Sequence, residues 1–85
     1  MQTQNKIMKL EIITPETELF NGEVKSVKLP GSTGEFEILK NHAPIISTLN
    51  KGDIRIITSE QDSKKISING GVIELQNNKI IVLAN

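Results

Sequence analysis

Turn-forming residues divide this sequence into many short segments. Groups containing Pro, Gly or Asn recur along the chain at Thr14-Pro15, Asn21-Gly22, Pro30-Gly31, Asn50-Lys51-Gly52, Asn69-Gly70-Gly71 and Asn77-Asn78. Such residues either fix φ or tolerate positive φ. Few segments between them could hold a three-turn helix, and none has the apolar spacing of an amphipathic helix. We therefore expect short strands joined by turns, with at most one short helical turn.

Branched side chains and periodicity favour the same structure. The chain has 14 Ile, 4 Val and 6 Thr, so 24 of its 85 residues are β-branched, a type that packs well on pleated sheets. Apolar and polar residues alternate at 8–12, 54–56 and 66–68, as in strands with one buried face. The sequence thus predicts an all-β fold, an antiparallel β-sandwich of about eight to ten short strands in two sheets.

Several local details of this fold can be predicted. Asn77-Asn78 indicates a tight antiparallel hairpin, and residues 59–63 indicate a longer one. Val24 and Val27 are three residues apart, where two or four would keep one face, which predicts a bulge or bend. Segments 12–13 and 80–83 are apolar on both faces, a pattern typical of strands covered on both sides.

The length of the chain sets its domain organisation. A chain of 85 residues can form one core only. We assign residues 8–85 to the sandwich and residues 1–7 to a polar N-terminal extension. The longest apolar runs are far shorter than the roughly 18 to 20 residues of a spanning helix. The N-terminus also lacks the apolar stretch of a signal peptide, so we expect no membrane insertion and no export.

Charge and composition argue against several classes of partner. Lys+Arg and Asp+Glu are 10 each, so the formal net charge is zero and a nucleic acid would gain little long-range attraction. Aromatic residues make up 2% of the chain, which leaves no platform for stacking bases or sugars. The absence of Cys removes disulfides, thiolate metal sites and cysteine nucleophiles, and favours a reducing compartment.

The sequence offers little catalytic chemistry. His42, the single His, could act as a general base beside Glu35 or Glu37, but the chain has no second His and no Cys, so a turn histidine is the simpler interpretation. The scattered carboxylates have no metal-ligand spacing. Residues 31–34 lack the Lys and the following helix of a phosphate loop. A binding or scaffolding domain is the better interpretation, with a small hydrolase or isomerase built on His42 and Glu35 as an alternative.

A second alternative is a stand-alone sandwich that binds a ligand or carries a cofactor. Lys79 follows the predicted Asn77-Asn78 turn, where carrier domains display a modified lysine, but the methionines that flank such a lysine are absent. An unmodified intact mass would argue against this alternative.

Three blocks of sequence resemble the epsilon subunit of F-type ATP synthases. Their order and spacing extend over residues 9–85, which gives the resemblance its specificity. The first block comprises residues 10–16, 19–24 and 27–36; the second comprises 42–49 and 51–56; the third comprises 70–75 and 79–84.

The resemblance implies a non-catalytic subunit at the foot of the central stalk. In that family the N-terminal β-sandwich binds the gamma subunit and touches the ring of c subunits, so that proton or sodium flow reaches the catalytic sites as torque. The implied location is the cytoplasmic face of the bacterial cell membrane, as a peripheral part of the ATP synthase. The resemblance implies no cofactor, no metal and no nucleotide site.

The resemblance also assigns site residues by position. The loop expected to face the c ring comprises Gly31, Ser32, Thr33, Gly34 and Glu35, with Glu35 as the charged contact. The segment expected at the gamma interface comprises His42, Ala43, Pro44 and Ile45. The alternative for Glu35 is a solvated carboxylate at the start of a strand, and the alternative for the His42 segment is simple turn geometry.

An apolar patch for gamma could include Ile13, Ile45, Ile57 and Val72, although a core covered on both faces would account for these residues equally well.

Some positions depart from the family pattern. Glu37 stands where Gly is frequent, and Lys40-Asn41 replaces a common Pro-Gly. Family members usually continue into a two-helix hairpin, whereas this sequence stops at Asn85 with the last expected strand. The inhibitory and ATP-sensing behaviour of the family belongs to that hairpin, so neither is expected of these 85 residues.

Overall fold

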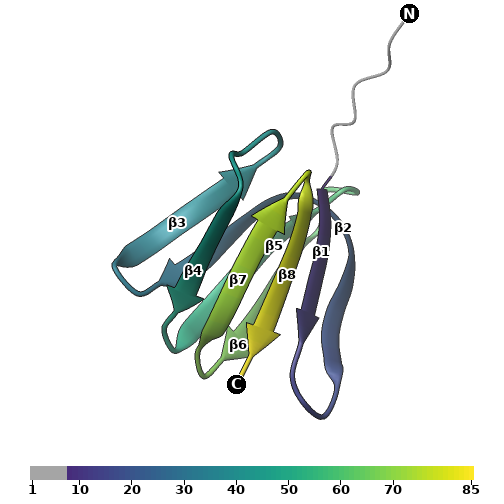
Figure 1. Cartoon of the computed structure of the whole chain (residues 1–85). Coiled ribbons are helices and arrows are strands. Elements are labelled where there is room, and N and C mark those ends of the chain that lie inside the picture. Colours follow the sequence, from purple (N-terminus) through teal and green to yellow (C-terminus); the bar gives the residue numbers. More distant parts are fainter. Residues whose placement is uncertain (1–7) are drawn as a thin grey trace, which may run out of the picture.

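The computed structural model describes residues 8–85, which form eight strands and no helix (Figure 1). The prediction of an all-β sandwich is confirmed; the predicted extension, residues 1–7, lies outside the described residues. The strands are β1 Met8–Ile13, β2 Glu18–Gly31, β3 Gly34–Leu39, β4 Ile45–Leu49, β5 Gly52–Thr58, β6 Ser63–Ile68, β7 Gly71–Gln76 and β8 Lys79–Ala84.

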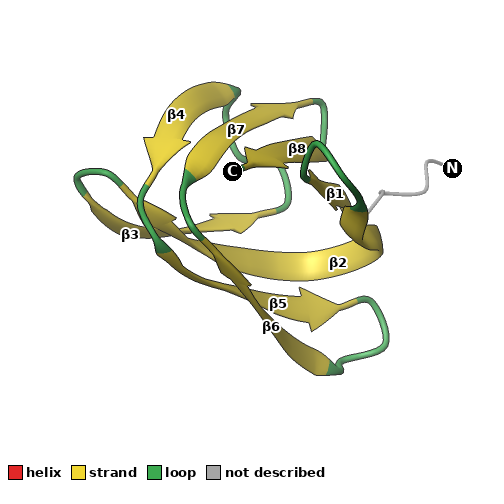
Figure 2. Cartoon of the chain, turned by 90° about the horizontal axis from the view of Figure 1, so that it is seen from below, coloured by secondary structure: helices red, strands yellow, loops and turns green. Residues whose placement is uncertain are grey.

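The strands form two layers that share one long strand (Figure 2). They are hydrogen-bonded in the order β1-β8-β7-β4-β2-β5-β6, with β3 on β2 and a further pairing between β1 and β2. The first part of β2 pairs with β1, and its second part pairs with β3 and β5. We call β4, β7, β8 and β1 the β7 layer, and β3, β5, β6 and the second part of β2 the β5 layer.

A bulge lets β2 pass from one layer to the other. The register between β2 and β5 shifts between Val24 and Ser26, and Val24 and Val27 are both fully buried. The extra residue, Lys25, thus keeps both valines in the core despite their odd spacing. The predicted bulge is confirmed. At 14 residues, β2 is longer than the short strands expected, because the bend lets one strand serve both layers.

One pairing departs from the antiparallel prediction. β1 runs parallel to β8, with Leu10 opposite Ile80 and Ile12 opposite Val82. Parallel neighbours need a long connection between them, and here the six intervening strands supply it. The pairing joins elements from the two ends of the described chain, so no local turn signal could have predicted it.

Both predicted hairpins are confirmed. Asn77 and Asn78 have φ of 54° and 62° and join Gln76 to Lys79, as in a two-residue turn of type I′. Residues 59–62 connect β5 to β6, with Gln61 at φ 72°. Asn tolerates this left-handed region better than most residues, which explains its use at the tighter turn.

The core lies between the layers and is apolar. No polar or charged residue is buried within residues 8–85. The buried side chains alternate along each strand and include Leu10, Ile12, Leu29, Ile38, Ile54, Ile56, Ile73, Leu75, Ile80 and Val82. The expectation that residues 80–83 are covered on both faces is wrong within this chain, because Leu83 is 54% exposed. In segment 12–13, Ile12 is buried and Ile13 is half-buried. Within residues 8–85, no helix is long and apolar enough to cross a membrane.

Candidate functional site

The predicted c-ring loop is a tight turn fastened to the neighbouring layer. Ser32 and Thr33 join β2 to β3, with Gly31 opposite Gly34. The backbone N–H of Ser32 donates to the carbonyl oxygen of Thr48 at 3.1 Å, and the Ser32 and Thr48 hydroxyl oxygens lie 2.6 Å apart. These bonds tie the turn to the end of β4.

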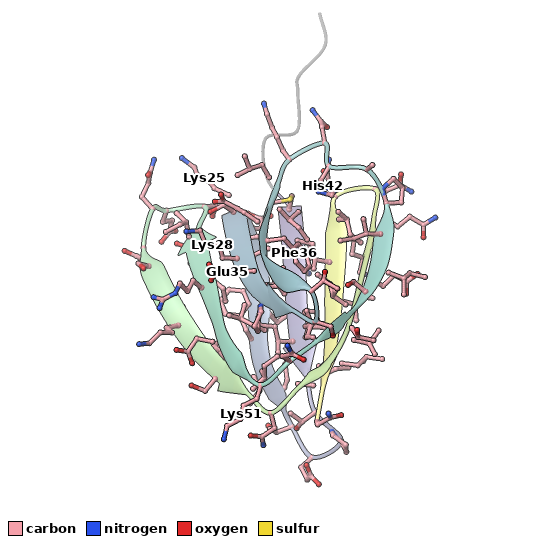
Figure 3. The ribbon with its side chains drawn as sticks, turned by 90° about the vertical axis from the view of Figure 1, so that its left-hand side faces the viewer. Lys25, Lys28, Glu35, Phe36, His42 and Lys51 are labelled. Atoms are coloured by element: carbon pink, nitrogen blue, oxygen red, sulfur yellow. The ribbon has the colours of Figure 1, made fainter. Side chains whose placement is uncertain are left out.

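Gly31 permits the tight geometry of this turn. A Cβ atom at Gly31 would lie 2.6 Å from the carbonyl oxygen of Gly34 and 2.8 Å from the ring of Phe36. Real Cβ atoms do not approach backbone so closely, so any larger residue would displace the turn or the ring. The Phe36 ring packs against the core, while Glu35 beside it is exposed at the start of β3 (Figure 3).

The predicted gamma-interface segment forms an exposed loop between β3 and β4. Asn41 has φ of 63°, and its backbone N–H donates to Asn78 Oδ1 at 3.0 Å, which links this loop to the β7–β8 turn. His42 N–H donates to the carbonyl oxygen of Leu39 at 3.3 Å. His42 Nδ1 lies 2.8 Å from the carbonyl oxygen of Ala43, within hydrogen-bonding distance. Hydrogen bonds thus define the loop, while His42, Ala43 and Pro44 remain exposed.

Ile45 and Ile46 face opposite sides of β4. Ile45, which the sequence suggested for the interface, is half-buried and packs against the core. Ile46, which it did not single out, is 75% exposed. Pro44, Ile46 and Glu74 contribute to the lining of a surface hollow of about 380 Å³. Side chains alternate between the two faces of a strand, so Ile45 and Ile46 are expected on opposite faces. The sequence does not show which of the two faces the core.

Three exposed and two half-buried apolar side chains gather on the outer face of the β7 layer. Thr48 pairs with Val72, Val72 with Leu83 and Leu83 with Ile13, so Val72, Leu83 and Ile13 form one row across the strands. The adjacent row runs through Ile46, Glu74 and Ile81. We call this set the apolar stripe: Ile13, Ile46, Val72, Ile81 and Leu83.

The apolar stripe includes two of the four apolar residues suggested from sequence. Ile13 and Val72 lie in it and help to line a second hollow of about 450 Å³. Ile45 faces the core instead, and Ile57 lies on the outer face of the β5 layer beside Ser26 and Ser63. Sequence reasoning missed Ile46, Ile81 and Leu83, although the unbroken apolar run 80–83 was a signal of apolar residues on both strand faces.

The structure separates the residues of the hydrolase alternative. Glu35 is the second residue of β3, and His42 follows the end of that strand. The four steps from Glu35 to Leu39 alone extend about 13 Å at about 3.3 Å per residue. Figure 3 likewise draws Glu35 and His42 at different heights of the molecule. No group of three or more His, Cys, Asp or Glu residues in the described range could hold a metal ion. Glu35 and His42 therefore do not form one site in the described part of the chain.

Comparison with known proteins identifies similar chains. The family model described as "ATP synthase, Delta/Epsilon chain, beta-sandwich domain" matches residues 7–85. A Chlorobium limicola protein named ATP synthase epsilon chain is 41% identical over 83 residues, which cover 98% of this chain and 94% of that protein. A Pelotomaculum thermopropionicum protein of the same name is 42% identical over 83 residues, which cover 95% of this chain but only 60% of that protein.

A solved structure has the same fold. In the cryo-EM structure of the Euglena gracilis mitochondrial ATP synthase, described as OSCP/F1/c-ring, one chain matches with a TM-score of 0.88. The match covers 98% of the present chain and 53% of that chain, at 13% sequence identity. At this identity the likeness establishes a shared fold and nothing more.

Proposed function

This chain belongs to the ATP synthase delta/epsilon beta-sandwich family, and from that membership we propose that it is a non-catalytic rotor subunit of an F-type ATP synthase. In this role it links the gamma subunit to the c ring and couples ion translocation to ATP synthesis. The family match over residues 7–85 is the observation that carries the proposal. We place the subunit at the cytoplasmic face of the bacterial membrane, held there by protein partners.

The apolar stripe supports a large protein partner on the β7 layer. Ile46, Val72 and Leu83 are 75%, 40% and 54% exposed, and two hollows lie beside them. Contiguous exposed apolar surface on a small domain is typical of a protein interface. We assign this face to gamma, together with the adjoining loop His42, Ala43 and Pro44. Ile45 then supports the interface from the core side.

The Gly31–Gly34 turn supports a second, smaller contact. It projects from the β2–β3 hairpin, its Ser32 is bonded to β4, and Thr33 and Glu35 are exposed. A turn held in one conformation loses little entropy on binding, which suits contact with polar loops of a partner. We assign this contact to the c ring, with Glu35 as its charged group.

β4 connects the two proposed contacts mechanically. The His42 loop enters β4 at Ile45, Ile46 projects from its outer face, and Thr48 near its end is bonded to Ser32. β4 is itself paired along its length with β7. Close-packed interiors transmit strain with little local yielding, so a force applied at one contact would reach the other through this strand.

Co-purification with the gamma subunit of the same organism tests the proposal. We expect a one-to-one complex by size-exclusion chromatography and calorimetry. Ile46→Lys should weaken that complex at least tenfold without lowering the thermal midpoint, because Ile46 is 75% exposed and a lysine there would lie opposite Glu74. A charge at Ile45 would be a poorer test, because it would also disturb packing.

Glu35→Gln provides the matched control. It lies at the turn and away from the apolar stripe, so it should bind gamma normally. Thr33→Cys, in a chain that otherwise lacks Cys, should form a disulfide with a cysteine placed in the polar loop of the c subunit. Absence of a gamma complex at tens of micromolar with the chain folded, or equal loss of binding in both variants, would contradict the proposed assignment.

A further inference from the structure

Three cations align on the outer face of the β5 layer. Lys28 on β2 lies directly opposite Arg55 on β5, and Arg55 lies directly opposite Lys65 on β6. All three are exposed, and their neighbours Val27, Leu29, Ile54 and Ile56 point into the core. We call Lys28, Arg55 and Lys65 the cationic row. In Figure 3, Lys28 lies on the side of the molecule away from His42.

The cationic row is unfavourable for folding alone. Like charges on directly opposed residues of adjacent strands destabilise a sheet, and this row contains two such oppositions in succession. Glu37 on β3 faces Lys28 from the other side, yet within residues 8–85 none of the three cations forms an ion pair within 4 Å. An anionic group placed over the row would relieve both repulsions.

The surface around the row suits more than a single ion. The cationic row helps to line a hollow of about 260 Å³, whose other lining residues are one further cation, one carboxylate, two serines and one isoleucine: Lys64, Glu37, Ser26, Ser63 and Ile57. The hollow thus holds four cations and one carboxylate. The adjacent row of the sheet runs from Leu39 through Ser26 and Ile57 to Ser63, and Leu39 is 53% exposed. Hydroxyl donors and two apolar side chains therefore flank the cations.

The charges of the whole face argue against a membrane surface. Glu35, Glu37 and Asp53 project from the same face and balance the three cations. Asp53 also accepts a hydrogen bond from the Ser67 hydroxyl at 2.7 Å. A uniformly anionic bilayer would lie over these carboxylates as well as over the cations and would gain no net attraction, whereas a short segment can place its carboxylates over the cationic row alone. A free phosphate is also poorly served, because the N–H groups of a central strand are used in the sheet and not offered to a ligand.

We propose that this face binds an acidic segment of a protein partner, whose carboxylates pair with Lys28, Arg55 and Lys65 and whose apolar side chains pack on Ile57 and Leu39. Arg55 at the centre can hold a carboxylate with two parallel hydrogen bonds. The face lies on the opposite layer from the apolar stripe. A partner here could therefore bind while the β7 layer is occupied.

An NMR titration of the full 15N-labelled chain with a peptide tests this proposal. The probe is an acetylated, amidated peptide of about ten residues in which pairs of glutamates alternate with pairs of leucines, so that an extended conformation presents both residue types on one face. We expect saturable shifts of amides in 26–28, 55–57 and 63–65, at least a tenfold loss of affinity in Arg55→Glu, and weaker binding as salt is raised.

Matched variants and probes decide between occupants. Lys79→Glu makes the same charge reversal on the β7 layer, where Lys79 lies opposite Lys9. It should change the affinity for the peptide less than twofold. Equal loss in Lys79→Glu and Arg55→Glu, or shifts confined to β7 and β8, would overturn the proposal. Inorganic phosphate or phosphatidylserine vesicles that reproduce the same shifts at equal charge concentration would overturn the choice of a protein segment. Concentration-dependent shifts at these residues without peptide would assign the face to a second copy of the chain.

Discussion

The outer faces of the two layers differ although their inner faces are alike. Both layers send Ile, Leu and Val into one core, yet the β7 layer presents Ile46, Val72 and Leu83 to solvent, whereas the β5 layer presents the cationic row with three balancing carboxylates. Formation of the core requires apolar side chains on the inner faces only. The difference outside therefore indicates two surfaces suited to partners of different chemistry.

The largest expected effect is a difference in stability between substitutions on the inner and the outer face of the β7 layer. Ile73→Ala should lower the free energy of unfolding by about 2–5 kcal/mol, because Ile73 is fully buried and its loss leaves a cavity. Val72→Ala, one residue earlier on the same strand, should change it by less than about 0.5 kcal/mol. Urea denaturation of both variants measures this. Equal losses would mean that the apolar stripe is part of the folding core.

A matched leucine pair tests the difference between the outer faces. Leu83→Asp on the β7 layer and Leu39→Asp on the β5 layer change side chains that are 54% and 53% exposed. We expect Leu83→Asp to weaken gamma binding at least tenfold, or about 1.4 kcal/mol, and Leu39→Asp to leave it unchanged. Calorimetry with purified gamma measures both. A larger loss of gamma binding in Leu39→Asp would mean that gamma binds the β5 layer and not the β7 layer.

Loss of the hydrogen bond between the Ser32 and Thr48 hydroxyls should have a moderate effect on stability. Thr48→Val removes the hydroxyl that lies 2.6 Å from Ser32 Oγ, and we expect a loss of about 0.5–1.5 kcal/mol in unfolding free energy. Hydrogen exchange should also accelerate at the Ser32 amide, which donates to Thr48. Thr33→Val, in the same turn, is the control and should change stability by less than about 0.5 kcal/mol. If both substitutions are silent, the turn is held by its backbone alone.

The smallest expected effect is a gain in stability. Arg55→Gln removes both like-charge oppositions of the cationic row and should raise the unfolding free energy by about 0.2–1 kcal/mol. The gain should shrink in 1 M salt, where charges are screened over about 3 Å. Lys51→Gln, in the β4–β5 loop and outside any strand pair, should show no such gain. A loss of stability in Arg55→Gln would remove the premise that the row is unfavourable for folding.

Local patterns predicted those parts of the fold that depend on neighbouring residues. The alternation at 8–12 and 66–68, the Asn77-Asn78 turn and the spacing of Val24 and Val27 each gave a correct element, because strand faces, tight turns and bulges are set within a few residues. The parallel pairing of β1 with β8 was not predicted, because it joins segments about 70 residues apart through no shared turn.

The candidate sites divide in the same way. The turn 31–35 and the loop 42–44 were identified from sequence as exposed segments, and they are exposed in the structure apart from Gly31. Their assignment to particular partners remains a prediction. The apolar stripe was predicted only in part, since Ile45 faces the core, Ile57 lies on the other layer, and Ile46 and Leu83 were missed.

The sequence by itself determined the strands, their turns, the side chains that can enter a core and the membership in a family. Only the tertiary structure decided which outer-face residues become neighbours: Leu83 lies between Val72 and Ile13, and Arg55 lies between Lys28 and Lys65. The physical reason is that side-chain alternation and turn chemistry act along the chain. A surface on a sheet is built across strands, by a register that the packing of the whole core fixes.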